Sequence, residues 1–247
     1  MKLKNVLYLV LFLSTNSGCF GQDAIEIINR YIDSTGGIEN WKNVQTVYKE
    51  SYVIFENNYL GYTSESIVDN KTPSLHLTYK KMDTKQQKTE VYKNFQLEGR
   101  IYCRGENCDM FIRQSKVPVR LNSDLALLKF TAITFAEWLN KKKNIFFKYI
   151  GAEEMKGNNY YIVQITNPKA KWKQRQNCYF NTKTFLIDYL VDIDNKDNFT
   201  KLDDYRKVGN VIVPFKTYSK KGGVEFFRSE IRKMEFNIDL EDNIFDL

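Results

Sequence analysis

Histidine is the scarcest residue in this sequence that could carry acid–base, nucleophilic or metal chemistry, since His76 is the only one among 247 residues. Ser-His-Asp triads and multi-histidine metal sites would all depend on this one side chain, so most chemistry of these kinds is excluded. The sequence also lacks a Gly-x-Ser-x-Gly motif, a phosphate-binding loop and a dinucleotide-binding fingerprint. We therefore predict no catalytic residue, no cofactor and no enzymatic activity.

Carboxylates occur in three groups that could bind a metal or act as an acid–base pair. Asp203-Asp204 and Glu153-Glu154 are adjacent in sequence, and adjacent residues of a strand point to opposite faces of a sheet. Asp192, Asp194 and Asp197 are spaced like the start of a calcium loop, but the Gly at its sixth position and the Glu at its twelfth are absent. The sequence therefore predicts no metal site.

Two of the four cysteines flank a turn. Cys103 and Cys108 enclose Arg-Gly-Glu-Asn, and in an oxidising compartment a disulfide closing this hairpin tip is expected. Cys178 lies in a strand-like run, where a buried free thiol is expected. One histidine and so few cysteines would supply a zinc site poorly.

The N-terminus has the pattern of a secretory leader. Lys2 and Lys4 precede an eight-residue apolar run at 6–13, far shorter than the roughly 20 residues needed to span a bilayer. Cleavage after Gly21 would remove residues 1–21. Alternatively, Ser-Gly-Cys ending at Cys19 is a lipobox core, so that residues 1–18 are removed and Cys19 is acylated. Both alternatives predict export to the periplasm or outer membrane.

Composition favours β structure in the rest of the chain. Aromatic residues make up 15% of the sequence, and aromatic side chains suit pleated sheets. The formal charge of +7 becomes +5 when the two leader lysines are removed. Because the basic residues are scattered among acidic ones and the chain is exported, nucleic acid is not an expected partner.

Two apolar helices and about a dozen strands are expected. Apolar residues recur at helical spacing over 23–35 and 124–142, and alternate with polar residues almost everywhere else. Asp23 is expected to cap the start of the first helix. The connections are short and rich in Gly, Asn and Asp, which favours antiparallel hairpins, and no linker divides residues 22–247. These features predict one α+β domain, mainly antiparallel β, with a large curved sheet (an unclosed half-barrel) wrapped over the two helices.

A sheet of this width needs something to fill its concave face, which could be a helix, an apolar ligand or both. The candidates for lining a ligand site are large apolar and aromatic residues on one alternating face of the strands and on the second helix. They are Tyr52, Ile54, Tyr62, Leu75, Leu77, Tyr79, Val91, Phe111, Leu128, Phe135 and Trp138. Binding by burial of apolar surface needs no catalytic residue.

Both ends of the chain resemble a known family. The residues that carry the resemblance are the run from Ala24 to Ile32 with Gly36-Gly37 and Trp41, then Asp204-Tyr205-Arg206 with Gly209, Val213-Pro214-Phe215-Lys216, Phe236-Asn237 and Ile244-Phe245. Over about 23–50 and 185–247, the chain is similar to envelope proteins of Bacteroidetes-type bacteria that are grouped with the outer-membrane lipoprotein-sorting (LolA/LolB-like) superfamily. The resemblance implies an unclosed barrel over helices with an apolar cavity that receives lipoprotein acyl chains or another lipid.

The expected function is therefore binding of a lipid, a lipoprotein acyl chain or another apolar ligand in the concave face of a half-barrel. Its role would be in outer-membrane lipid or lipoprotein handling, with outer-membrane components as partners. The alternative is a non-enzymatic interaction module that binds a protein or glycan through its rim loops.

Overall fold

A computed structural model describes residues 23–55, 72–105, 107–112, 115–117, 132–140, 145–167 and 174–246. The described strands form one antiparallel sheet in the order β6-β5-β4-β3-β2-β1-β13-β12-β11-β10-β9-β8-β7. The strands are β1 (Thr46–Phe55), β2 (Ser74–Lys81), β3 (Gln86–Lys93), β4 (Gln96–Arg104), β5 (Asn107–Ile112), β6 (Ser115–Val117), β7 (Phe146–Met155), β8 (Asn158–Asn167), β9 (Gln174–Asn181), β10 (Ile187–Asp192), β11 (Phe199–Val208), β12 (Val211–Lys221) and β13 (Val224–Phe236).

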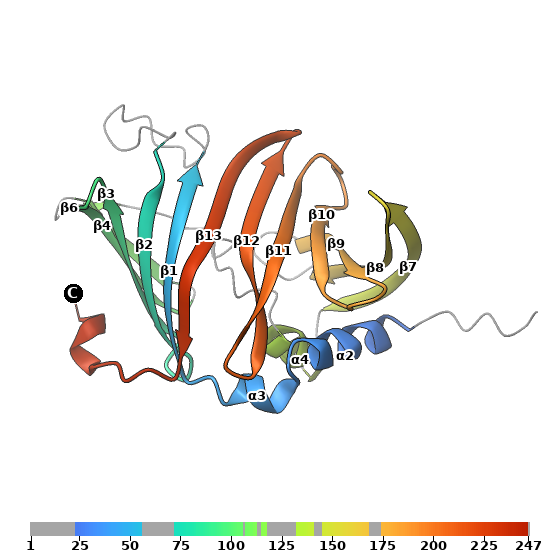
Figure 1. The fold of residues 1–247 in the computed structure, drawn as a ribbon, viewed down its shortest axis with the longest axis horizontal. Helices are drawn as coiled ribbons and strands as arrows, with labels where there is room; N and C mark the ends of the chain where they lie inside the picture. The colour runs from blue at the N-terminus through green and yellow to red at the C-terminus, as the bar shows by residue number, and fades with distance from the viewer. Residues whose placement is uncertain are drawn as a thin grey trace, which may run out of the picture.

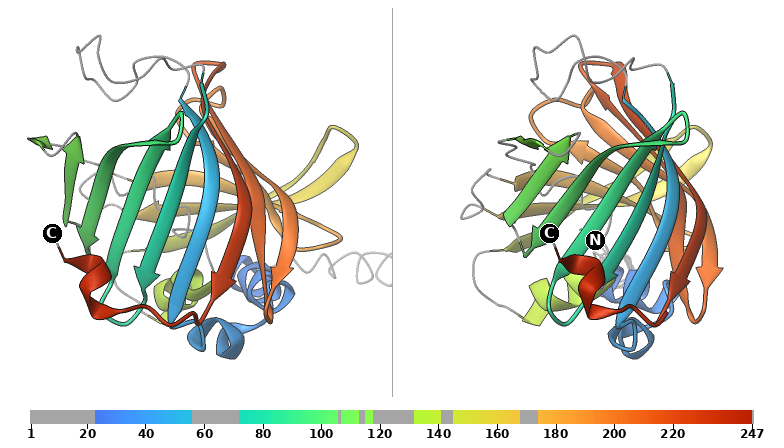
Figure 2. Two further views of the ribbon diagram at one scale, coloured as in Figure 1. Left: turned by 60° about the vertical axis from the view of Figure 1, so that its left-hand side comes forward. Right: turned by 90° about the vertical axis from the view of Figure 1, so that its left-hand side faces the viewer.

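The sheet consists of two meanders that meet in its middle. Strands β1 to β6 run outward to one edge, and β7 to β13 return from the other edge until β13 pairs with β1. The edge strands β6 and β7 do not pair with each other. The sheet is strongly curved (Figures 1 and 2), so the expected unclosed half-barrel is confirmed.

In the part of the chain that the structure describes, three α-helices lie at one end of the sheet (Figure 1). They are α2 (Ala24–Ser34), α3 (Ile38–Lys42) and α4 (Ala132–Asn140), and a short 3-10 helix, η2 (Asp242–Phe245), ends the described chain. α2 and α4 contact each other, and α2 also contacts β7 and β8. α4 falls within the second expected helix, whereas the expectation for 124–131 and 141–142 lies outside the described residues.

α2 begins and packs as its sequence predicts. The Asp23 carboxylate accepts a hydrogen bond from the Ile25 backbone N–H at 3.1 Å, which satisfies one free donor of the first turn. The apolar stripe predicted from the helical spacing is buried, and comprises Ala24, Ile27, Ile28, Tyr31 and Ile32. This amphipathic face attaches the N-terminal segment to the sheet.

The end of α2 docks on the β11–β12 turn. The Thr35 carbonyl accepts hydrogen bonds from the Ile212 N–H at 2.9 Å and from the Trp41 indole N–H at 3.1 Å. Gly36 has φ +113°, and a Cβ added to it would lie 2.3 Å from the Asn210 carbonyl oxygen. Glycine is required here because both the backbone angle and the close approach exclude a side chain.

We predict that Gly36→Ala lowers the free energy of unfolding by about 2–4 kcal/mol, because strain at positive φ adds to a backbone collision. The matched control is Gly37→Ala, where φ is +79° and a Cβ would meet nothing within 4 Å. That control should lose only about 1 kcal/mol from strain. Urea denaturation followed by circular dichroism measures both, and equal losses would show that the contact with Asn210 costs nothing.

Candidate functional site

The odd-numbered residues of β1 point to the concave face. Val47 pairs with Phe236 of β13 and belongs to the main core that packs against the helices. Because successive side chains of a strand alternate between faces, Lys49, Ser51 and Val53 share the face of Val47. The cross-strand register then assigns the neighbouring strands to the same two faces.

Six predicted ligand-site residues lie on the opposite, convex face. Tyr52 points to the convex face, and the register pairs it with Leu75 of β2. Residues that pair across neighbouring strands share a face, so the register identifies the convex residues of β3, β4 and β5 as well. The six residues are Tyr52, Ile54, Leu75, Leu77, Tyr79 and Phe111. The expectation that they line the concave face is wrong, because alternation shows which side chains share a face but not which face curves around the helices.

The other predicted residues are placed differently. Val91 faces the concave side opposite His76, and it is half-buried. Phe135 is fully buried in the main core, and Trp138 packs against that core. Tyr62 and Leu128 lie outside the described residues. A ligand-binding role for Val91, Phe135 and Trp138 therefore stays a prediction.

One part of the concave face is apolar. The main core brings α2, α3 and α4 against strands from both halves of the sheet. Tyr31, Phe135 and Phe180 form three edge-to-face ring pairs there, with centroids 5.3 to 6.3 Å apart. The buried core residues contributed by β10 to β13 are Ile187, Leu190, Leu202, Val211, Val213, Phe215 and Ile231.

A second part of the concave face is polar, and sequence reasoning missed it. β2 directs Ser74, His76, Thr78 and Lys80 to the concave side, opposite inward residues of β1 and β3. The signal was present in the sequence, because these residues alternate strictly with Leu75, Leu77 and Tyr79. Polar residues that alternate with apolar ones normally face water, and here the apolar residues occupy the convex side.

Buried hydroxyl groups continue across this polar part. The Thr78 and Thr89 Oγ1 atoms lie 3.2 Å apart, and the Gln87 side-chain amide donates to Thr89 at 3.3 Å. On β12 and β13, Thr217 and Ser229 face each other and are both buried. The Ser229 Oγ has no hydrogen-bond partner among the described residues, and such an unpaired buried group is rare in folded proteins.

Three basic side chains share this polar part. Loss of hydration, together with the charge of Lys80, lowers the pKa of Lys49 from 10.5 to about 8. Loss of hydration lowers the pKa of Lys80 as well. Burial and the neighbouring Lys49 lower the pKa of His76 to about 3, so its ring is neutral, with Nε2 2.9 Å from the Ser74 hydroxyl. We call Lys49, His76 and Lys80 the basic cluster.

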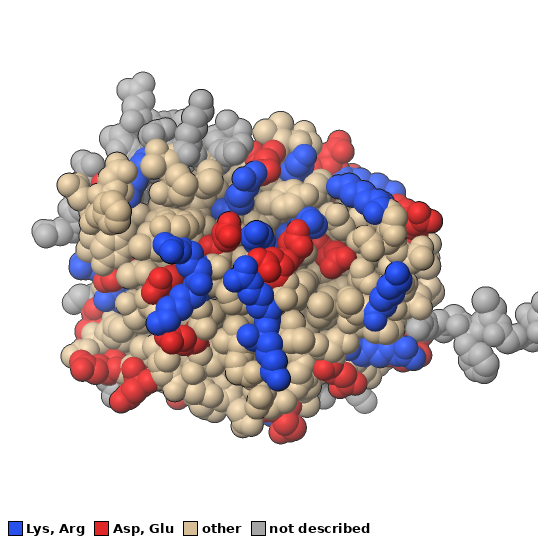
Figure 3. Space-filling model, in the orientation of Figure 1, with Lys and Arg blue, Asp and Glu red and all other residues tan. Residues whose placement is uncertain are grey.

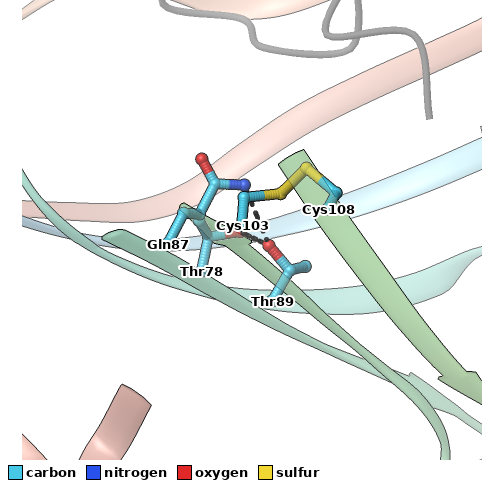
Figure 4. The surroundings of a disulfide bond; sticks show 5 residues. All are labelled: Thr78, Gln87, Thr89, Cys103 and Cys108. Atoms are coloured by element: carbon cyan, nitrogen blue, oxygen red, sulfur yellow. Dashed lines mark hydrogen bonds between the residues drawn. A yellow bond between two sulfur atoms is a disulfide. The ribbon is translucent and has the colours of Figure 1, made fainter. Parts of the chain in front are cut away.

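The predicted disulfide between Cys103 and Cys108 is confirmed. It joins β4 to β5 on the concave side, next to Gln87 in the register, and Figure 4 shows it close to Thr78 and Thr89. The expectation that Cys178 is a buried free thiol is also confirmed. Burial raises the pKa of that thiol, which therefore stays protonated.

We predict that replacing both Cys103 and Cys108 by serine lowers the free energy of unfolding by about 2 kcal/mol, the loop-entropy value for so short a loop. Denaturation curves with and without a reducing agent provide the measurement and its control. Reduction should destabilise the unaltered protein by the same amount and leave the double variant unchanged. An effect of reduction on the double variant would contradict the assignment of the loss to this bond.

The convex face differs from the concave face in how its charges are paired. Figure 3 shows Lys and Arg side chains interspersed with Asp and Glu over the surface seen in Figure 1. Lys233 forms an ion pair with Glu235 at 2.9 Å, and Lys88 with Glu90 at 3.1 Å. The Lys233–Glu235 pair is half-exposed, and exposed pairs of this kind are weak, whereas the Lys88–Glu90 pair is largely shielded from solvent.

Neither a metal-binding cluster nor a membrane-spanning helix is found in the part of the chain that the structure describes. In those residues, no three His, Cys, Asp or Glu side chains are grouped so that they could hold an ion. The helices within the same ranges are all too short or too polar to cross a bilayer.

The unclosed antiparallel half-barrel with helices at one end of its concave face is a fold that this chain shares with proteins of known structure. A LolA superfamily protein from Nitrosomonas europaea matches with a TM-score of 0.58 and 12% identity, over 91% of this chain and 98% of that one. A DUF1329 family protein from Desulfovibrio piger matches with a TM-score of 0.59 and 14% identity, over 91% and 97%.

A third solved structure, a domain assigned to outer membrane lipoprotein sorting from Vibrio parahaemolyticus, matches with a TM-score of 0.59 and 10% identity, over 91% of this chain and 96% of that one. No family model matches the sequence, and no curated protein matches it either. The predicted LolA-like fold is thus confirmed, whereas the narrower resemblance to Bacteroidetes-type proteins stays a prediction.

The residues that carried the resemblance shape this fold. Asn237 accepts a hydrogen bond from the Gln45 N–H at 2.7 Å and fixes the start of β1. Gly209 makes the β11–β12 turn at φ +57°, and Phe215 is buried in the main core. These roles explain why a short motif can indicate a fold without indicating a chemistry.

Proposed function

We propose that this protein is an exported, non-catalytic protein of the cell envelope that binds a lipid or a lipoprotein acyl chain on the concave face of its half-barrel. The observation that carries the proposal is the LolA-like fold, in which one part of the concave face is apolar. Each methylene group of an acyl chain buried there would contribute about 0.8 kcal/mol. Outer-membrane lipid or lipoprotein handling is the role that this binding would serve.

The test is to purify the protein from its own envelope and to analyse an organic extract by mass spectrometry. We expect a bound amphiphile with an acyl chain, and we expect delipidated protein to bind a long-chain fatty acid in solution. The matched control is the same extraction from a co-purified envelope protein of another fold. Delipidated protein that binds no acyl compound would contradict the proposal.

Export itself is tested by the mass of the mature protein. Cleavage after Gly21 leaves Gln22 as the first residue, whereas lipoprotein processing leaves an acylated Cys19. An intact mass that includes residues 1–18 would contradict both alternatives.

A second candidate function is recognition of a protein or glycan by the rim, and one observation favours it. Phe95 is fully exposed at the β3–β4 turn, and Leu97 and Val224 are exposed close to turns at the same end of the sheet, away from the helices. If this second function is correct, Phe95→Ser should abolish retention of the protein on isolated outer membranes. The unaltered protein should then bind no fatty acid.

A further inference from the structure

Two ammonium groups of the concave face, those of Lys49 and Lys80, have no countercharge among the described residues. Among the inward residues of β1, β2 and β3, which the register identifies, none is acidic. Lys49 lies opposite Thr78 on β2 and opposite Met234 on β13, with His76 and Lys80 diagonal to it. Lys49 and Lys80 form no ion pair with any described carboxylate, in contrast to Lys88 and Lys233 on the convex face.

A hydroxyl proton beside these ammonium groups also lacks an acceptor. Thr78 and Thr89 carry two hydroxyl protons, and the hydrogen bond between them uses only one. The Gln87 amide adds a further donor to Thr89 and no acceptor. One hydroxyl proton therefore lacks an acceptor among the described residues, beside two ammonium groups that also only donate.

This arrangement is costly without an occupant. Desolvated ammonium groups without a carboxylate lose hydration and gain nothing in return, and the lowered pKa of Lys49 reflects that cost. All three side chains of the basic cluster nevertheless keep accessible surface on the concave side. An external acceptor with negative charge would satisfy the ammonium groups and the free hydroxyl proton together.

We propose that the ligand of the concave face is an anionic amphiphile, whose carboxylate or phosphate head group is held by Lys49 and Lys80 with a hydroxyl of the Thr78–Thr89 pair. This inference rests on the proposed function and narrows it to one class of ligand. The neutral His76 and the Ser74 hydroxyl border the head group on one side. The acyl chain continues over Ile231 and Met234 of β13 towards the main core, since both side chains lie on the same face beside Lys49.

The experiment compares four probes by isothermal titration calorimetry at pH 7: dodecanoate, dodecyl phosphate, dodecanol and inorganic phosphate. Charge-assisted hydrogen bonds should make the two anionic amphiphiles bind about 10- to 100-fold more tightly than dodecanol. Lys49→Met with Lys80→Met should remove this preference by weakening the binding of the two anionic amphiphiles to about that of dodecanol. The control is Lys233→Met, which removes the same charge from the convex face and should keep the preference.

The preference should also decline as the pH rises through about 8, where the free Lys49 loses its proton. The groups that face Lys49 from the adjoining strands are His76 and Lys80 on β2 and the uncharged Met234 and Ile231 on β13. His76 stays neutral throughout this range, so only the two lysines determine the effect. Thermal denaturation of each variant verifies that it is folded before binding is measured.

Each outcome is decisive. Equal affinity for dodecanoate and dodecanol, unaffected by the double variant, would overturn the anionic head group while leaving the proposed lipid binding intact. Binding of inorganic phosphate as tight as that of dodecyl phosphate would also overturn it, by showing a site for a free anion. Failure of all three amphiphiles to bind would contradict the proposed function itself.

Discussion

Replacing Phe135 by alanine is expected to lower the free energy of unfolding by about 3–5 kcal/mol, the usual cost of removing a fully buried phenylalanine. The Phe135 ring is inaccessible to solvent and forms edge-to-face pairs with Tyr31 at 5.3 Å, Trp138 at 5.5 Å and Phe180 at 6.3 Å. It thereby connects α4 to α2 and to β9. Urea denaturation measures the loss, which is a large part of the 5–15 kcal/mol typical of a domain.

Phe95→Ala is the matched control, because it makes the same substitution at a fully exposed side chain. Its free energy of unfolding should change by less than about 0.5 kcal/mol. The comparison also tests the role assigned to Phe135. If its ring lined a ligand site instead of filling the core, the variant would keep its stability and change only its affinity for acyl chains.

Replacing Lys49 by methionine is expected to stabilise the ligand-free protein, although Lys49 is a proposed ligand contact. The pKa of Lys49 is lowered in the folded state from 10.5 to about 8, so the folded protein holds this proton less tightly than the unfolded chain does. Below pH 8 both states are protonated, and the folded state carries the full cost of the desolvated charge. Between pH 8 and 10.5 that cost disappears, and the unaltered protein gains stability as the pH rises.

Lys49→Met should therefore raise the free energy of unfolding at pH 7 by about 1–3 kcal/mol, a value reduced for the partial exposure of the side chain. The advantage should shrink as the pH approaches 10.5. Thermal denaturation between pH 6 and 10.5 measures it, with Lys233→Met as the control. Lys233 is half-exposed and paired with Glu235, so its loss should change stability by less than about 0.5 kcal/mol. A destabilised Lys49→Met variant would mean that the ammonium group has a structural partner.

A stabilising substitution that weakens binding is characteristic of a functional residue. Unpaired charge persists in a fold only when something other than stability requires it. Affinity and stability are therefore both measured for Lys49→Met. If Lys49 is a ligand contact, the substitution lowers the affinity and raises the stability, whereas replacing a merely structural lysine would lower both.

Much of the fold followed from the sequence alone. The apolar stripe of α2, its Asp23 cap, the antiparallel hairpins and the cysteine turn are local features, and each depends on residues near one another in the chain. Helical and strand periodicities are likewise local, because they reflect the geometry of one element. The resemblance at the two ends of the chain pointed to the LolA-like fold for a related reason, since its residues make turns, caps and core contacts.

Only the tertiary structure decided which face of each strand lies on the concave side of the sheet. β2 carries two alternating sets, Leu75, Leu77 and Tyr79 on one face and Ser74, His76, Thr78 and Lys80 on the other, and periodicity treats them alike. Pairing of β1 with β13, some 180 residues apart in the chain, joins the two meanders into one sheet, and the register places the polar set of β2 on the same face as the core residue Val47. Which face becomes the interior thus depends on long-range packing, and that packing placed the basic cluster where an apolar lining was expected.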